Sequence, residues 1–151
     1  MNSLTQRASY PTHFIALNSE PKGSLRHWEN PDLVDDHLIP IRTLLRIRGK
    51  ESALALLTQL PQRGLAVVGT RKPQNKTQHL ITRWIHSLRG QNLIVISGLA
   101  TGIDAIAHQA AIDVGIPTIG ILGCGHSVPY PFKNEGLKSR ILESGGLIIS
   151  E

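Results

Sequence analysis

Three apolar runs that each end in a glycine-bearing turn constrain this 151-residue chain more than any other feature. The runs end at Val68, Ile96 and Leu122, and stretches with helical spacing follow them. β-forming residues that lead through a glycine turn into a helical pattern are typical of a parallel α/β sheet. In such a sheet, ligands bind in the crevice beyond the carboxyl ends of the strands. We therefore predict that the three turns face one crevice, where backbone N–H groups favour an anion such as phosphate.

The regular pattern predicts a domain over residues 41–151, preceded by an irregular extension over residues 1–40. The extension has prolines at positions 11, 21, 31 and 40, and its apolar piece 14–17 fits either a strand or one helical turn. The expected strands cover residues 41–49, 65–68, 93–96, 118–122 and 147–149. The expected helices cover residues 51–60, the stretch around 80–88, 103–114 and 134–143.

Four details of this pattern can be checked against a structure. The alternating segment 41–49 predicts an edge strand, and Pro61 is expected to end the first helix. Trp84 shares an apolar stripe with its neighbours at helical spacing, which predicts a core anchor. Gly90 falls just past the end of that helix, where a left-handed residue is expected.

Composition excludes several classes of protein. No apolar stretch approaches the roughly 20 residues that span a bilayer, and no apolar run of signal-peptide length follows the N-terminus. We therefore expect no membrane partner. The single cysteine, Cys124, excludes an internal disulfide and fits a reducing cytoplasm. Its place between two glycines suits a small residue in a tight turn, and a reactive thiol is the alternative.

The charge distribution favours a polyanionic partner. The chain carries a formal charge of +5, with seven Lys and Arg against six Asp and Glu in residues 1–60 and nine against five in residues 61–151. The predicted α/β domain therefore holds most of the excess. A basic face attracts phosphate backbones in a salt-dependent way, although many basic proteins bind no nucleic acid.

The first turn, residues 69–73, carries a hydroxyl and two cations. Gly69 permits the turn, Thr70 offers a donor, and the planar guanidinium of Arg71 suits two phosphate oxygens, with Lys72 beside it. The alternative is a solvated loop with incidental charge.

The second turn, residues 97–104, offers free amides at a helix start. Gly98 and Gly102 flank that start, so Ser97 and several N–H groups are expected to converge on an anion. The spacing is neither the Gly-x-Gly-x-x-Gly fingerprint nor a Walker P-loop. Asp104 falls in the first helical turn, where we expect it to cap the helix.

No pattern for catalysis or metal binding is present. The seven histidines show no metal-ligand spacing, and neither a nucleophile elbow nor a carboxylate pair occurs. His108 could share a face with Asp104, but with no nucleophile available we expect it to pack inside the helix layer. Lys133 follows a proline-stiffened loop and is expected to reach the crevice of Arg71, with a solvated lysine as the alternative.

Five ordered motifs closely resemble the DNA-processing protein A (DprA/Smf) family. They are Val-Val-Gly-Thr-Arg-Lys-Pro (67–73), Ser-Gly-Leu-Ala-Thr-Gly-Ile-Asp-Ala-Ile-Ala-His (97–108), Ile-Leu-Gly-Cys-Gly (121–125), Tyr-Pro-Phe-Lys-Asn (130–134) and Gly-Gly-Leu-Ile-Ile-Ser-Glu (145–151). The resemblance implies an α/β fold with a Rossmann-like parallel sheet flanked by helices. It also implies a protein that is not an enzyme, needs no cofactor, binds single-stranded DNA, and acts in natural transformation and recombination by loading a RecA-type recombinase.

The resemblance and the turn chemistry together give a set of candidate site residues. The resemblance places the DNA pocket on the first turn, on Ser97 and Gly98, and on Lys133 with Asn134. The complete set of expected DNA- or phosphate-binding residues is Gly69, Thr70, Arg71, Lys72, Ser97, Gly98, Gly102, Gly123, Gly125, Lys133 and Asn134.

Two departures from the family pattern bear on the expected partners. The extension over residues 1–40 does not match the helical domain that usually precedes the Rossmann unit. Family members also continue past the Ser-Glu motif with strands that help form a homodimer and contact RecA. The resemblance therefore implies a fragment or a truncated form. The alternatives from other classes are a nucleotide-sensing module and a LOG-like phosphoribohydrolase, whose Pro-Gly-Gly-x-Gly-Thr-x-x-Glu motif is absent from this sequence.

Overall fold

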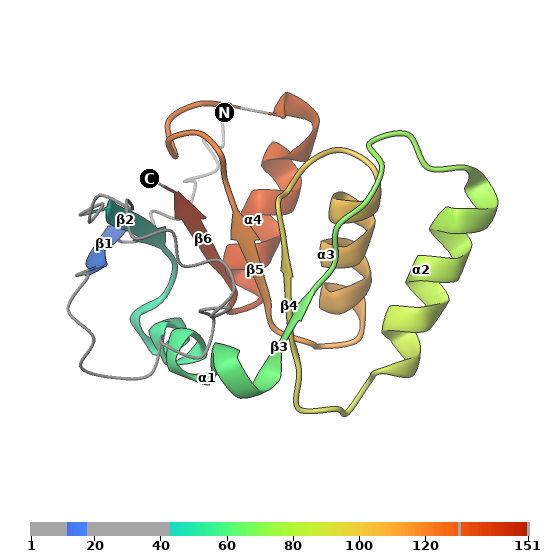
Figure 1. Ribbon diagram of the computed structural model, residues 1–151, viewed down its shortest axis with the longest axis horizontal. Helices are drawn as coiled ribbons and strands as arrows, with labels where there is room; N and C mark the ends of the chain where they lie inside the picture. The colour runs from blue at the N-terminus through green and yellow to red at the C-terminus, as the bar shows by residue number, and fades with distance from the viewer. Residues whose placement is uncertain (1–11, 18–42, 130, 151) are drawn as a thin grey trace, which may run out of the picture.

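Six strands form one sheet in the computed structural model, which describes residues 12–17, 43–129 and 131–150. Across the sheet, from left to right in Figure 1, the strands are β1 (Thr12–Leu17), β2 (Thr43–Arg48), β6 (Leu147–Ser150), β5 (Thr118–Ile121), β4 (Ile94–Ser97) and β3 (Gly64–Ala66). Strands β3 to β6 are mutually parallel, which confirms the predicted α/β fold.

The first two strands run against the others and make the sheet mixed. β2 is antiparallel to β6, and β1 pairs with β2 over all six of its residues. The prediction of an edge strand at 41–49 is therefore wrong, because β1 supplies the outer hydrogen-bonding partner. The piece 14–17 lies in β1 and is a strand, whereas the prolines of the predicted extension and residues 41–42 lie outside the described residues.

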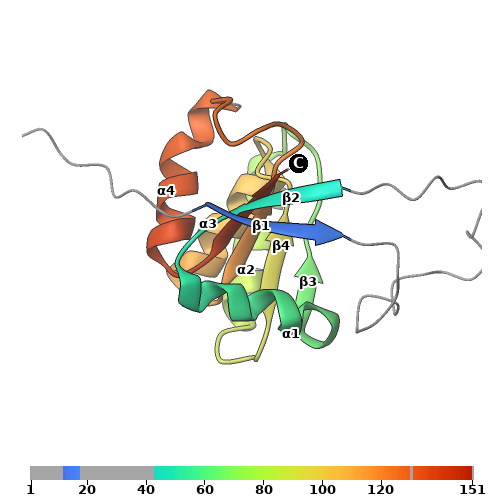
Figure 2. The ribbon, with the colours of Figure 1, turned by 90° about the vertical axis from the view of Figure 1, so that its left-hand side faces the viewer.

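Helices cover both faces of the sheet. A 3₁₀ turn (Glu51–Leu54) leads into α1 (Ala55–Arg63), whose leucines pack on one face against a core that includes Ile47, Ile119 and Leu147. The other face carries α2 (Asn75–Ser87), α3 (Ile103–Asp113) and α4 (Glu135–Glu143). Figure 2 views this arrangement from the β1 side, with α1 below the sheet.

Small residues on α3 allow it to lie close to the sheet. Ala107, Ala110 and Ala111 are buried there with Val95, and Ile85 of α2 completes the same core. A helix in this place agrees with the one expected over residues 103–114. Continuous apolar strands with both faces covered are the pattern expected of a parallel sheet.

Two local predictions on the helices are wrong. Trp84 is 43% exposed, because Ile81, Ile85 and Leu88 form the buried stripe of α2 and Trp84 lies at its border. Pro61 lies inside α1, which continues to Arg63, and the N–H of Gly64 closes the last turn on the carbonyl of Leu60. A proline so near the end removes only one helical hydrogen bond.

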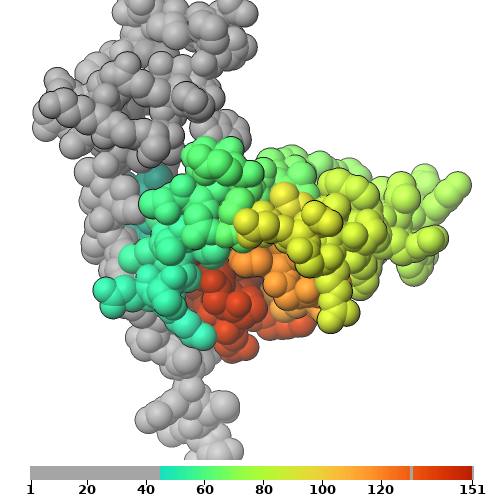
Figure 3. Space-filling view, turned by 90° about the horizontal axis from the view of Figure 1, so that it is seen from below, coloured from blue at the N-terminus to red at the C-terminus, as the bar shows by residue number. Residues whose placement is uncertain are grey.

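The carboxyl ends of the parallel strands meet at one edge of the molecule. The loops that follow β3, β4 and β5 all lie along the upper edge in Figure 1. The opposite edge, seen in Figure 3, is covered by α1 and by the turns that precede the central strands. In the described part of the chain, no helix is long and apolar enough to cross a membrane.

Candidate functional site

The loops after β3 and β4 pack directly on each other. The N–H of Ile103 donates to the carbonyl of Thr70 at 3.1 Å. Gly102 has φ +88°, and a Cβ placed on it would lie 2.7 Å from the Cα of Arg71. A Cβ on Gly69 would likewise meet the side chain of Ile103 at 2.7 Å. Both glycines are therefore required for the close approach that places Arg71 beside the start of α3.

Hydrogen bonds to other parts of the protein occupy two groups of the second loop that the sequence predicted to bind an anion. The N–H of Gly98 donates to Oδ2 of Asp104 at 3.1 Å, and the hydroxyl of Ser97 donates to the carbonyl of Val67 at 2.6 Å. Ser97 is buried, whereas Gly98 is exposed. The contribution of this loop to a ligand site therefore comes from its outer residues rather than from the Ser97 hydroxyl.

Asp104 lies in the first turn of α3, as expected, but it does not cap the helix. The N-cap position is Gly102, and no side chain bonds to the free amides there. Asp104 is 4% exposed and points toward Gly98, while its Oδ1 is buried and makes no hydrogen bond with the described residues. The expected capping role is wrong, because the loop amide of Gly98 competes successfully for the carboxylate.

His108 is buried inside the helix layer, as expected. Its Nδ1 lies 2.6 Å from the Thr118 hydroxyl, which itself donates to the carbonyl of Val95 at 2.9 Å. Because the hydroxyl proton is already used, Nδ1–H is the donor to Thr118. Burial lowers the pKa of His108 to about 4, against the opposing effects of the Ser97 backbone and the Asp104 carboxylate. The ring is therefore neutral at pH 7.

Asn134 attaches the third loop to the second. Its Nδ2 donates to the carbonyl of Leu99 at 2.8 Å and to that of Ala100 at 3.1 Å, and the residue is buried. Leu99 has φ +56° and is fully buried beneath this contact. Asn134 therefore holds two loops together, and its neighbour Lys133 is exposed at their junction.

All three connections come together in a cavity of about 300 Å³. It is lined by Arg71 from the first loop, by Ala100 and Thr101 from the second, and by residues 131–133 from the third. The lining includes two cations and no carboxylate. This is the arrangement expected of a site for a phosphate group.

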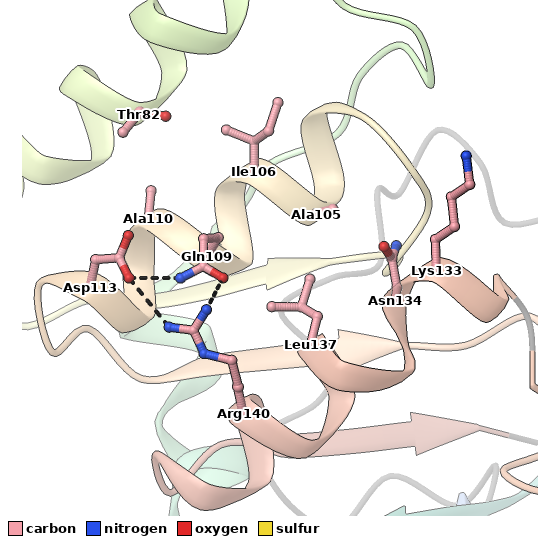
Figure 4. Close-up of a pocket in the computed structure, with 10 residues that line it drawn as sticks. All are labelled: Thr82, Ala105, Ile106, Gln109, Ala110, Asp113, Lys133, Asn134, Leu137 and Arg140. Carbon is pink, nitrogen blue, oxygen red and sulfur yellow. Dashed lines mark hydrogen bonds and ion pairs between the residues drawn. The ribbon is translucent and has the colours of Figure 1, made fainter.

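A second cavity of about 440 Å³ adjoins the first through Lys133 (Figure 4). It lies between α2, α3 and α4, with Ile106 and Leu137 on its apolar part. At its far end, Arg140 bonds to the Gln109 amide and forms an ion pair with Asp113 at 3.5 Å. The polar groups at this end of the second cavity therefore bond to one another.

The other expected site residues do not line the first cavity. The Thr70 hydroxyl accepts a hydrogen bond from the N–H of Lys72 at 3.2 Å, and both residues are exposed. Gly123 and Gly125 belong to the loop after β5 but line neither cavity. Between them, Cys124 is half-buried and packs against the core beneath α4, which agrees with a small turn residue.

Phe132 is a candidate site residue that the sequence reasoning missed. It lines the first cavity and is 79% exposed. An exposed aromatic ring beside two cations suits a ligand that has both a base and a phosphate. The sequence did offer a signal for Phe132, because it directly precedes the expected site residue Lys133 in the Tyr-Pro-Phe-Lys-Asn motif. Tyr130 of the same motif lies outside the described residues.

The parallel strand order, with a charged crevice at the carboxyl edge, defines an α/β protein of the Rossmann-like class. Within that class, the chain belongs to the DNA recombination-mediator protein A family, whose family model matches residues 45–151.

Within the described residues, no group of three or more His, Cys, Asp or Glu side chains could hold a metal ion.

The sequences of two relatives support this assignment. The chain is 38% identical over 87 residues to the DNA processing protein DprA of Streptococcus pneumoniae, and 36% identical over 87 residues to the protein Smf of Escherichia coli. These matches cover 58% of this chain in each case, but 30% and 23% of the two relatives. The chain thus spans less than a third of their length.

Solved structures share the fold. The Streptococcus pneumoniae DprA structure superposes with a TM-score of 0.60 at 34% identity, covering 72% of this chain and 35% of the other. The Helicobacter pylori DNA processing protein A gives a TM-score of 0.61 at 24% identity, covering 91% and 54%. The second likeness concerns the fold alone.

Proposed function

We propose that this chain binds single-stranded DNA at the carboxyl edge of its sheet. The observation that carries the proposal is the cavity in which Arg71 of the first loop lies with Phe132 and Lys133 of the third. Cations bind backbone phosphates, and an exposed ring stacks on bases without selecting their sequence. The chain's family, which is described as DNA recombination mediators, supports the same ligand.

A small nucleotide is the alternative ligand for this cavity. A volume of about 300 Å³ is at the small end of the range for ligand sites and would also accept a mononucleotide. Two features favour a strand instead. The cavity opens beside the exposed Phe132, and Lys133 also borders the second cavity, so the lined surface continues beyond a single nucleotide.

Competition between the two ligands tests the proposal. Fluorescence anisotropy of labelled oligo(dT) should show binding that unlabelled oligo(dT) reverses and that dTMP or ATP at the same nucleotide concentration does not. Displacement by a mononucleotide at a concentration similar to that of the strand would show that the site is a nucleotide pocket. Absence of oligo(dT) binding by the folded chain would overturn the proposed function itself.

We further propose that the bound strand is passed to a RecA-type recombinase in recombination and DNA uptake in the cytoplasm, with the protein acting as a homodimer. The support is the family's description as recombination mediators and the resemblance in five motifs. Strand exchange by RecA on DNA coated with a single-stranded DNA-binding protein should start sooner when this chain is added. An unchanged lag would contradict the mediator role, and sedimentation of a monomer at all concentrations would contradict the dimer.

A further inference from the structure

A second group of cations lies on β2, outside both cavities. Arg46 and Arg48 alternate with Ile47, so the two arginines share one face of the sheet. Ile47 is buried toward α1, which places both arginines on the face covered by α4. The register agrees, because Arg48 lies opposite Ile148, a member of the core beneath α4.

His126 and Lys138 bring the loop after β5 and α4 to the same place. The Nε2–H of His126 donates to the carbonyl of Arg46 at 2.9 Å. Burial lowers the pKa of His126, opposed by its bond to the Arg46 carbonyl, and the charges of Arg48, Lys138 and Arg46 lower it further. The charges of all three cations therefore act on the same histidine.

The charge in this cluster is only partly compensated. Lys138 is 8% exposed, and its Nζ lies 2.6 Å from the Glu135 carboxylate. No ion pair of Arg46 or Arg48 with another described residue is present. The Nε of Arg48 is buried and makes no hydrogen bond with any residue that the structure describes. A buried charged donor without an acceptor is unfavourable, so an anion that reaches this guanidinium would stabilise it.

The cluster is continuous with the first cavity along the chain. Lys133 lies in the 3₁₀ turn Phe132–Asn134, which leads directly into α4, and Lys138 lies on the first turns of that helix. The loop between β5 and this turn carries His126 on one side and the cavity-lining residues 131–133 on the other. A strand that leaves the cavity across this loop would therefore meet Arg46 and Arg48.

We propose that Arg46, Arg48 and Lys138 form a second phosphate-binding patch, which holds the continuation of the single strand bound at the first cavity. The inference rests on the proposed function. It assigns the patch to the backbone of the strand and gives it no role in reading bases, because all its ligand groups are cations.

Oligonucleotide length separates the two sites. The double variant Arg46→Gln/Arg48→Gln removes two charges from the patch. The variant Arg83→Gln/Arg89→Gln is a matched control, because it removes two exposed charges on and after α2. Each folded protein is titrated with oligo(dT) of about 5 and about 20 nucleotides, lengths that bracket common single-strand site sizes. The exposed single variant Arg46→Gln is added in case the change at half-buried Arg48 impairs folding.

The patch predicts a loss that depends on length. The double variant should bind the long strand about tenfold more weakly and the short strand within twofold of the parent. Its salt slope on the long strand should be smaller by about 1.4, the value for two phosphate contacts. Arg46→Gln should show the same length dependence with about half the change in slope.

Three results would overturn the patch. The first is an equal loss with the Arg83/Arg89 control, and the second is an equal loss on both lengths. The third is displacement of the long strand by sodium phosphate beyond that of chloride at the same ionic strength, which would indicate a free-anion site. If the Arg71→Ala protein binds both lengths as tightly as the parent does, the proposed DNA site at the first cavity is contradicted rather than the patch.

Discussion

The N–H of Ile103 donates to the carbonyl of Thr70 at 3.1 Å and thereby joins the start of α3 to the loop after β3. This bond links two glycine turns that are about thirty residues apart in the sequence. It determines where Arg71 leaves the backbone, and thus where its guanidinium meets the loop that carries Lys133. The candidate site therefore depends on contacts between loops as much as on the charged side chains.

Replacing Gly102 should separate these loops. The Gly102→Ala protein combines an unfavourable positive φ with a Cβ against the backbone of Arg71, so we expect a loss of about 2–3 kcal/mol in the free energy of unfolding. Gly90→Ala is the control, because Gly90 has φ +79° with nothing within 4 Å of a Cβ, and it should lose only about 1 kcal/mol. Chemical denaturation measures both, and equal losses would contradict the close approach.

Phe132 should contribute to DNA affinity without contributing to stability. It is 79% exposed at the cavity, and stacking on one base is worth about 1–3 kcal/mol. Phe132→Ala should therefore weaken oligo(dT) binding by that amount at an unchanged melting temperature. Trp84→Ala removes another partly exposed aromatic residue, from α2, and should leave binding unchanged. Equal affinities of the parent and the Phe132 variant would remove the ring from the site.

His108 should make stability depend on pH in the acidic range. Its pKa is about 4 when folded and about 6.5 when unfolded, so the unfolded chain binds more protons between these values. The free energy of unfolding should therefore fall as the pH falls from about 6.5 to 4, by up to about 3 kcal/mol from this residue. Urea denaturation across this range should show a smaller fall for His108→Gln than for the parent. Parallel curves would contradict a buried neutral histidine.

Salt should weaken binding in proportion to the phosphates engaged. A plot of log affinity against log salt should be linear for oligo(dT), with a slope of about −0.7 for each phosphate neutralised. Arg71→Ala should reduce the magnitude of the slope by about 0.7. A flat response for the parent would indicate a ligand held by its base rather than by its phosphates.

The parallel part of the fold could be predicted because its residues carry the pattern themselves. Strands β4, β5 and β6 are largely apolar runs. Strands of this kind are buried on both faces, which predicts a position inside a parallel sheet that is covered by helices. The place of β2 could not be predicted in this way. Its alternation identifies a strand, but whether that strand lies at an edge depends on pairing with β1, more than twenty residues earlier.

The site was predictable for the cations and not for the polar groups around them. Arg71 and Lys133 follow turns at the carboxyl ends of strands, and the topology alone brings such residues to one edge. The engagement of the Gly98 amide by Asp104 depends on a contact six residues away that competes with helix capping. The spacing of residues along the chain does not show which of these two contacts Asp104 makes. Spacing also does not show that Trp84 lies at the border of the buried stripe of α2 rather than inside it.

A double-mutant cycle on Arg71 and Lys133 tests the central claim most directly. Oligo(dT) affinity is measured for the parent, Arg71→Ala, Lys133→Ala and the double variant, with circular dichroism as the check on folding. Arg71→Ala should cost about 1–3 kcal/mol of binding free energy, the range for hydrogen bonds to charged groups. Because both residues line one cavity, the two losses should be coupled by at least about 0.5 kcal/mol. Parental affinity in the folded double variant would contradict the account.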